Sequence, residues 1–205
     1  MKRRVLGIYG SPRRGGNTDR LLDKALEGAK AAGAETKAVY ARDLKMSGCI
    51  ECGGCDKTGK CVVQDEMQGV YPLLEEADVV LLASPVFFYG VTAQVKALID
   101  RAQALWSKRR LEKGSEQRKH YHRGKGYLMV AGATGGKNLF EGIVLTGKYF
   151  FDALDMTYEG GLFFRGLEKG SDVREKPEAL DSAYKLGEKA GSGDGGHSED
   201  FKAVT

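Results

Sequence analysis

Five short apolar runs alternate along the chain with segments in which apolar residues recur at helical spacing. The runs cover residues 4–9, 35–40, 78–83, 127–131 and 157–164. The first run is continuous rather than alternating, which is typical of a parallel strand covered on both faces. After it, helical spacing is carried by Leu21, Leu22, Ala25, Leu26 and Ala29. Further helices are predicted at residues 67–76, 92–106, 139–154 and 176–190.

This alternation predicts an α/β fold with a doubly wound, five-stranded parallel sheet in three layers. The expected strand order is 2-1-3-4-5, which puts a ligand-binding crevice between strands 1 and 3 at the carboxyl edge of the sheet. Residues 1–190 are predicted to form one domain. Residues 191–205 are glycine-rich and polar, so a disordered C-terminal tail is predicted there.

The loop after the first strand, G-S-P-R-R-G-G-N-T over residues 10–18, has the composition of a phosphate-binding loop. Backbone N–H groups at a helix N-terminus attract anions, and polar side chains add donors and charge. The candidate residues are Ser11, Arg13, Gly16, Asn17 and Thr18. Because no Lys-Ser/Thr pair follows the glycines, the loop offers no place for magnesium and favours a monophosphate held without metal. The alternative is an ordinary turn that caps a helix.

Two further loops follow predicted strands and are expected at the same edge of the sheet. One is apolar and aromatic, which suits a flat apolar ligand such as a stacked ring system. It consists of Pro85, Val86, Phe87, Phe88, Tyr89 and Gly90. The other contains Thr134, Gly135 and Gly136. The alternative for the aromatic residues is packing in the core or at a subunit interface.

All four cysteines lie within thirteen residues, inside a loop predicted over residues 47–65. Cys49, Cys52, Cys55 and Cys61 have the spacing C-x2-C-x2-C-x5-C. Compact runs of this kind hold cubane iron-sulfur clusters, although the last gap here is longer than in bacterial ferredoxins. Structural zinc and a metal-free thiol redox pair are the alternatives. Disulfides are not expected, because the chain shows no secretory signal and cytosolic thiols stay reduced.

The chain has 205 residues, 41% of them hydrophobic, and a formal net charge of +4. This charge is too small to indicate nucleic-acid binding, and no membrane-spanning run is present, so a soluble, cytoplasmic protein is expected. Residues 107–125 carry eight basic and two acidic residues, a local charge of +6. This segment could dock an acidic ferredoxin, but a solvated loop or a subunit contact is the favoured interpretation.

Over residues 3–190 the chain resembles the iron-sulfur flavoprotein branch of the flavodoxin-like NAD(P)H-dependent FMN reductase superfamily. The resemblance is carried by residues 10–18, by C-I-E-C-G-G-C with Cys61 and Q-D-E-M, and by A-S-P-V-F-F-Y-G-V-T-A-Q-V-K-A-L-I-D-R over residues 83–101. It implies that Ser11, Arg13, Asn17 and Thr18 hold the FMN phosphate. It also implies that residues 85–90 and 134–136 hold the flavin ring and that the four cysteines hold a [4Fe-4S] cluster. Family members are homodimers or dimers of dimers, so a homodimer or homotetramer is expected.

Three functions remain open at this stage. The first is an electron-transfer flavoprotein that takes electrons from ferredoxin or NAD(P)H and delivers them to a small acceptor such as a quinone, dioxygen or peroxide. The second is an NAD(P)H-dependent FMN or quinone reductase without a cluster. The third, which is not enzymatic, is a flavin- or metal-binding redox sensor. No general acid or base is assigned, since the redox chemistry would belong to the cofactors.

Overall fold

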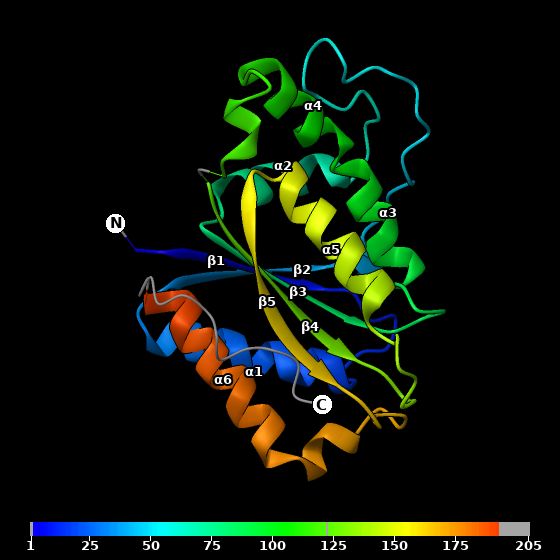
Figure 1. Ribbon diagram of the computed structural model, residues 1–205, viewed down its shortest axis with the longest axis vertical. Coiled ribbons are helices and arrows are strands. Elements are labelled where there is room, and N and C mark those ends of the chain that lie inside the picture. Colours follow the sequence, from blue (N-terminus) through cyan, green and yellow to red (C-terminus); the bar gives the residue numbers. More distant parts are fainter. Residues whose placement is uncertain (1, 122, 193–205) are drawn as a thin grey trace.

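A computed structural model describes residues 2–121 and 123–192, and within them the chain forms one five-stranded parallel sheet (Figure 1). The strand order is β2-β1-β3-β4-β5, so the predicted fold and order are confirmed. The strands are β1 (Arg4–Tyr9), β2 (Glu35–Tyr40), β3 (Val79–Pro85), β4 (Gly124–Ala131) and β5 (Met156–Phe164). The α-helices are α1 (Asn17–Ala31), α2 (Met67–Glu76), α3 (Ala93–Arg101), α4 (Gln103–Glu112), α5 (Glu141–Ala153) and α6 (Pro177–Ser192).

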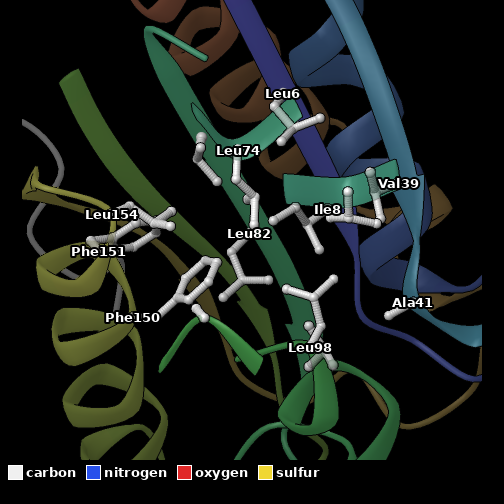
Figure 2. Close-up of a cluster of buried hydrophobic side chains, with 14 of the residues drawn as sticks. Leu6, Ile8, Val39, Ala41, Leu74, Leu82, Leu98, Phe150, Phe151 and Leu154 are labelled. Atoms are coloured by element: carbon white, nitrogen blue, oxygen red, sulfur yellow. The ribbon is translucent and has the colours of Figure 1, made fainter. Parts of the chain in front are cut away.

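Helices cover both faces of the sheet, with α1 and α6 on one side and α2 to α5 on the other (Figure 1). Successive strand residues point to opposite faces, so each strand contributes to two cores. Leu6 and Ile8 of β1 join the cluster under α2 to α5, where Phe150 and Phe151 of α5 also pack (Figure 2). Val5 of β1 joins the cluster under α1 and α6. This two-sided burial explains why the first strand reads as a continuous apolar run.

Several predicted boundaries differ from the structure, most of them by one to three residues, and two differences are larger or bear on the domain limits. The single helix predicted over residues 92–106 is two helices, α3 and α4, which meet at Ala102. Alanine is a strong helix former, so the sequence carries no signal for this break. At the other end, α6 continues through Gly191 and Ser192, two residues past the predicted domain boundary. The rest of the predicted tail, residues 193–205, lies outside the described residues.

Helices α1 and α6 pack so closely that glycine is needed where they meet. A Cβ atom on Gly187 of α6 would lie 1.8 Å from the carbonyl oxygen of Ala25 in α1. The contact is with backbone, so the helices would have to move apart. We expect Gly187→Ala to lower the free energy of unfolding by about 2 kcal/mol in urea denaturation.

Gly69 in α2 provides the matched control for this prediction. It is exposed, lies inside a helix, and has open space where a Cβ atom would be placed. Gly69→Ala should therefore raise stability by about 0.5–1 kcal/mol through helix propensity alone. Equal effects of the two substitutions would contradict the close approach of α1 and α6.

Within residues 2–121 and 123–192, no helix has both the length and the apolar character needed to cross a membrane.

Candidate functional site

A cavity of about 190 Å³ lies at the switch point of the sheet, where the loops after β1, β3, β4 and β5 meet. All five candidate residues of the phosphate loop line it, together with the first three residues of the aromatic loop. These residues are Ser11, Arg13, Gly16, Asn17, Thr18, Pro85, Val86 and Phe87. The structure thus brings together the strand-1 and strand-3 loops, as the predicted topology requires.

The N-terminus of α1 faces this cavity without a side-chain cap among the described residues. Its N-cap is Gly16, whose extended backbone (φ −74°, ψ −175°) needs no glycine. An uncapped helix N-terminus leaves backbone N–H groups available to an anion and adds the favourable end of the helix dipole. These features fit a phosphate group, because a ligand in the cavity would take the place of the missing cap.

Two of the predicted phosphate ligands, Asn17 and Ser11, make hydrogen bonds within the protein. The Asn17 side-chain amide donates to the Lys169 carbonyl at 2.8 Å, and its Oδ1 accepts from the Val173 N–H at 3.1 Å. Asn17 therefore joins α1 to the loop after β5. The Ser11 hydroxyl oxygen accepts from the Arg13 N–H at 3.1 Å and shapes the turn itself. The contacts of these residues with a phosphate remain a prediction.

A buried ion pair that sequence analysis missed supports the phosphate loop through Ser11 and Gly15. The Arg42 guanidinium lies 3.0 Å from the Asp19 carboxylate and donates to the Ser11 carbonyl, also at 3.0 Å. Asp19 in turn accepts from the Gly15 N–H at 2.9 Å. Burial raises the pKa of Asp19, while hydrogen bonds from Arg42 and Gly15 oppose that shift. Asp19 belongs to α1 and Arg42 to the segment after β2, so no local sequence motif predicts this pair.

The aromatic loop is a tight two-residue turn closed by Phe87 and Gly90. Their backbone groups exchange hydrogen bonds of 3.0 and 2.9 Å. Phe88 (φ 48°) and Tyr89 (φ 61°) both lie in the left-handed region, which this kind of turn needs at both central positions and which side-chain-bearing residues adopt at a cost. Phe87 lines the cavity, whereas Phe88 is 104% exposed. Only one of the three aromatic rings therefore lines the enclosed cavity.

Relieving this strained turn should stabilise the flavin-free protein. The double substitution Phe88→Asn/Tyr89→Gly supplies the residues that favour positive φ at both positions. We expect it to raise the free energy of unfolding by about 1 kcal/mol, measured by urea denaturation. It should at the same time weaken FMN binding if these aromatic side chains contact the ring. Lower stability instead would mean that the aromatic contacts outweigh the backbone strain.

The loop after β4 lines the cavity with only some of its residues. Ala131 and Ala133 line the cavity, but Thr134, Gly135 and Gly136 do not. The Tyr89 hydroxyl lies against Gly136, since it would be only 2.9 Å from a Cβ atom placed there. The aromatic loop and the 134–136 loop therefore touch. Together these two largely exposed loops form an open ledge beside the cavity.

The loop after β5 also lines the cavity, through Leu167, Glu168 and Gly170, and sequence analysis did not include it. The signal was present, because every strand-to-helix loop of such a sheet lies at the same edge. With this loop the cavity still holds only about 190 Å³, less than the roughly 300 Å³ at which typical ligand pockets begin. It therefore suits the phosphate end of FMN, with the ring on the open ledge.

All four cysteines line a second cavity of about 560 Å³, which also includes Arg101 and the start of α4. The loop is compact because Glu51, Gly53 and Gly59 have positive φ and residues 55–59 form a hydrogen-bonded turn. Among the described residues, no three metal-binding side chains yet converge on one point. Cysteines are the residues that hold iron-sulfur clusters, so the residue types and their shared cavity fit such a cluster.

Polar groups surround two of these sulfur atoms. The buried Ser107 hydroxyl of α4 lies 3.6 Å from the Cys55 Sγ. Burial of the Cys61 thiol opposes its ionisation, but hydrogen bonds from the Val63 N–H and Tyr71 and the charge of Arg101 outweigh it and lower the pKa of Cys61. A thiolate is the form that binds metal. Ser107 and Arg101 lie far from the cysteines in sequence, and Tyr71 lies on the next helix, so no local motif linked these three residues to the thiols.

Helix α3 connects the two cavities, which share no lining residue in the described part of the chain. At its start, the buried Thr92 hydroxyl donates to the Gly10 carbonyl at 2.5 Å, where the phosphate loop begins. At its end, Arg101 lines the cysteine cavity. The nine residues of α3 span about 14 Å at 1.5 Å per residue. The cysteine loop starts at the predicted edge, but its cavity lies at the far end of α3.

The basic segment 107–125 is largely paired with acidic residues, most of them from elsewhere in the fold and one, Glu116, from the segment itself. The ion pairs are Lys108–Glu75, Arg109–Asp152, Arg109–Asp155, Lys113–Asp155, Arg110–Asp56 and Lys119–Glu116. Arg118 and Arg123 donate to backbone carbonyls. These contacts favour the interpretation of a structural segment over that of an exposed docking surface for ferredoxin.

The chain is similar to several known proteins. The chain is 44% identical over 98 residues to an iron-sulfur flavoprotein of Archaeoglobus fulgidus, covering 48% of this chain and 44% of the relative. It is 41% identical over 102 residues to one of Methanocaldococcus jannaschii, covering 50% and 53%. The matches thus span about half the length of these relatives. A flavone reductase structure aligns over 98% of this chain and 66% of its own with a TM-score of 0.69 at 16% identity, which supports the fold.

The family comparison covers most of the sheet, the cysteine cavity, and the first cavity except for its lining by the loop after β5. Residues 3–159 match the family described as NADPH-dependent FMN reductase. This match includes the phosphate loop, the cysteine loop, the aromatic loop and the 134–136 loop. The segment shared with the iron-sulfur flavoproteins supports the predicted branch within that superfamily. The chain belongs to the NADPH-dependent FMN reductase family.

Proposed function

We propose that this protein is an FMN-dependent oxidoreductase that passes electrons between a donor, an iron-sulfur cluster, FMN and a small acceptor. The observation that carries the proposal is that four thiols line one cavity while an uncapped helix N-terminus lines another, with α3 between them. Family membership supports FMN as the ligand of the second cavity. The names of the relatives support a cluster in the first.

Each part of the FMN site has a separate task in this proposal. The N–H groups at the start of α1, with Thr18 and Arg13, would bind the phosphate. Phe87, from inside the cavity, and Tyr89 with the 134–136 loop, from the ledge, would orient the flavin ring. Thr92 fixes the phosphate loop to the start of α3 through Gly10.

The residues of the cysteine site would also have separate roles. Cys49, Cys52, Cys55 and Cys61 would coordinate a [4Fe-4S] cluster, and the Ser107 hydroxyl beside Cys55 would donate to sulfur. When bound, FMN supplies two-electron chemistry and the cluster supplies one-electron transfer. The role of the protein is to position both groups and to limit their contact with water. The donor would be NAD(P)H or a reduced ferredoxin, and the acceptor a small oxidant such as a quinone, dioxygen or peroxide.

The test is anaerobic purification followed by a visible spectrum and analysis for flavin, iron and sulfide. We expect a brown protein that contains FMN and equal amounts of iron and sulfide. Reduction by NAD(P)H and by reduced ferredoxin, each followed at the flavin and cluster bands, would identify the donor. A yellow protein with FMN but no iron would contradict the cluster and leave a simple NAD(P)H-dependent FMN or quinone reductase. FMN binding without turnover by any donor would instead indicate a sensor.

A homodimer or homotetramer is part of the proposal. The open ledge formed by the aromatic loop and residues 134–136 leaves one side of a bound ring uncovered in a single chain. A second chain could cover that side. Light scattering on the FMN-loaded protein would measure the mass, and a monomer would contradict this part of the proposal.

A further inference from the structure

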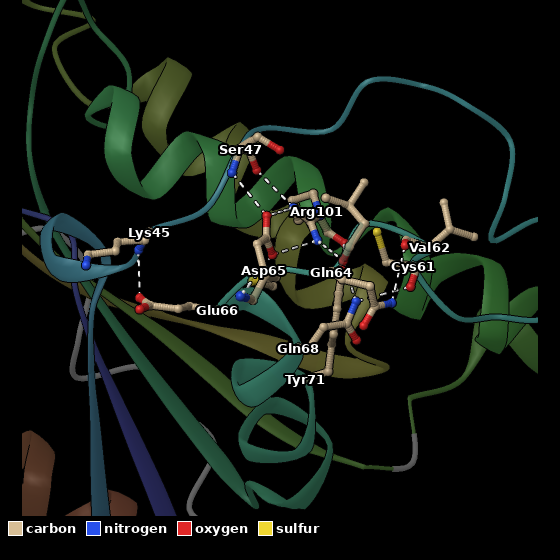
Figure 3. A network of polar contacts seen from close by, with 12 residues as sticks. Lys45, Ser47, Cys61, Val62, Gln64, Asp65, Glu66, Gln68, Tyr71 and Arg101 are labelled. Carbon is tan, nitrogen blue, oxygen red and sulfur yellow. Dashed lines mark hydrogen bonds and ion pairs between the residues drawn. The ribbon is translucent and has the colours of Figure 1, made fainter.

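Arg101 closes the cysteine loop at its base. It is the last residue of α3 and is only 1% exposed. Its Nη1 donates to the Ser47 carbonyl at 3.0 Å, and its Nη2 donates to the Val63 carbonyl at 3.3 Å (Figure 3). Ser47 precedes the first cysteine and Val63 follows the last. One side chain therefore holds both ends of the segment that carries all four thiols.

Asp65 pairs with Arg101 and also contacts both ends of the loop. Its two carboxylate oxygens accept from Arg101 at 2.7 and 3.1 Å, which is a bidentate pair. The same oxygens accept from the Ser47 N–H and from the Met67 N–H, both at 3.1 Å (Figure 3). Planar, bidentate geometry is specific to arginine, and lysine cannot reproduce it. The loop base is thus fixed by a pair whose two members cannot be exchanged for other charged residues.

The pair also brings charge to the cavity. Arg101 lines the cavity together with Cys49, Cys52, Cys55 and Cys61. Its Nε–H is buried and has no hydrogen-bond partner among the described residues, so one donor of a cavity-lining cation is available. A nearby positive charge stabilises the more negative, reduced form of a redox centre, and a nearby negative charge destabilises it.

We propose that Arg101 and Asp65 are positioning residues that preform the four-cysteine cavity, and that their opposite charges set the reduction potential of a cluster bound there. This rests on the proposed function, in which the cysteine loop holds an iron-sulfur cluster. In the redox step the cluster gains one electron from the reductant of the titration, and no covalent bond forms or breaks. Neither residue is a metal ligand, and both act through the loop and through their charge.

The two halves of the pair give opposite predictions for the potential. Arg101→Gln leaves the Asp65 charge without its cationic partner near a cavity that Glu51, Asp56 and Asp100 also line, so the potential should fall. Asp65→Asn leaves the Arg101 charge alone, so the potential should rise. We expect each change to shift the one-electron equilibrium at least tenfold, which is about 59 mV. A purely structural role would not move the two potentials in opposite directions.

Loop positioning is tested by loading. After anaerobic reconstitution of the full chain with iron and sulfide, Arg101→Lys, which keeps the charge but loses the bidentate geometry, should bind several-fold less iron than the wild type. Lys24→Gln is the control for loss of a surface cation, because Lys24 lies on α1 in an exposed pair with Glu27 and lines neither cavity. This variant should load and titrate like the wild type. FMN affinity and the thermal melting curve of each variant check that the sheet is intact.

The outcomes separate the two proposals. A wild-type protein that takes up no iron and sulfide contradicts the proposed function. A loaded wild type, with Arg101→Lys equally loaded and with both potentials unchanged or shifted the same way, overturns the present inference alone. If Arg101→Gln does not fold, Asp65→Asn decides by itself. A raised potential then supports the inference, and an unchanged or lowered one overturns it.

Discussion

Replacing Gly16 with aspartate is expected to stabilise the flavin-free protein and to weaken FMN binding about a hundredfold. Gly16 is the N-cap of α1, and its backbone conformation is open to any residue. A Cβ atom there would meet only Arg13, at 3.6 Å, so the side chain fits. Aspartate is a preferred N-cap and should contribute roughly a few tenths of a kcal/mol relative to glycine. The same carboxylate would occupy the N–H groups that we assign to phosphate and would repel that phosphate by several kcal/mol.

Gly16→Asn separates the two effects, because asparagine caps a helix as well as aspartate but carries no charge. Urea denaturation of the flavin-free variants gives the stability, and fluorescence titration with FMN and with riboflavin gives the affinities. We expect riboflavin, which has no phosphate, to bind both variants more nearly equally. If the aspartate variant bound FMN as tightly as the wild type, the phosphate of FMN would not bind at this helix N-terminus.

The regular elements of the fold were predictable from short-range patterns. The predicted limits of β1, β2 and α2 agree with the structure, because apolar periodicity and the flanking loops are local signals. The topology followed from the alternation of strands and helices. The topology in turn predicted a cavity at the switch point. All five candidate residues of the phosphate loop line that cavity.

Tertiary contacts decide the features that local patterns do not show. Phe88 is expected from its aromatic character to contact the flavin; a two-residue turn without Asn or Gly leaves it exposed, and its contact with the flavin stays a prediction. The charge of residues 107–125 allowed a ferredoxin-docking surface beside the favoured solvated loop or subunit contact, and Glu75, Asp152 and Asp155 neutralise much of that charge from other elements. Arg101 stood inside a recognised motif and had no visible role, because its partners Ser47 and Asp65 lie 54 and 36 residues away.

The cysteine loop illustrates the same limit within the candidate site. The spacing of the four cysteines indicated a common ligand, and all four line one cavity. The position of that cavity depends on how residues 47–65 fold back over α3 and α4, where contacts such as the Arg101–Asp65 pair and the Ser107–Cys55 contact hold the loop. Local composition could therefore predict the ligand set but not its place relative to the flavin site.

Removing Arg42 should destabilise the protein by about 3 kcal/mol near neutral pH, and less in acid. Arg42 and Asp19 are only 8% and 5% exposed at the side chain, so Arg42→Met would leave a buried carboxylate unpaired. The pKa of Asp19 is already raised by burial, and Arg42 opposes that shift. Without Arg42 the folded-state pKa must rise further above the unfolded value of about 3.9.

A carboxyl whose pKa is higher in the folded state favours folding most when it is protonated. The stability of Arg42→Met should therefore be greatest below the unfolded pKa of about 3.9 and should fall as the pH rises through the folded pKa of Asp19. Urea denaturation at about pH 5 and about pH 8 measures the difference. The double variant Arg42→Met/Asp19→Asn removes the stranded charge and should regain most of the lost stability, with little pH dependence. If the single variant lost the same stability at both pH values, Asp19 would not be the buried, Arg42-dependent carboxylate that supports the phosphate loop.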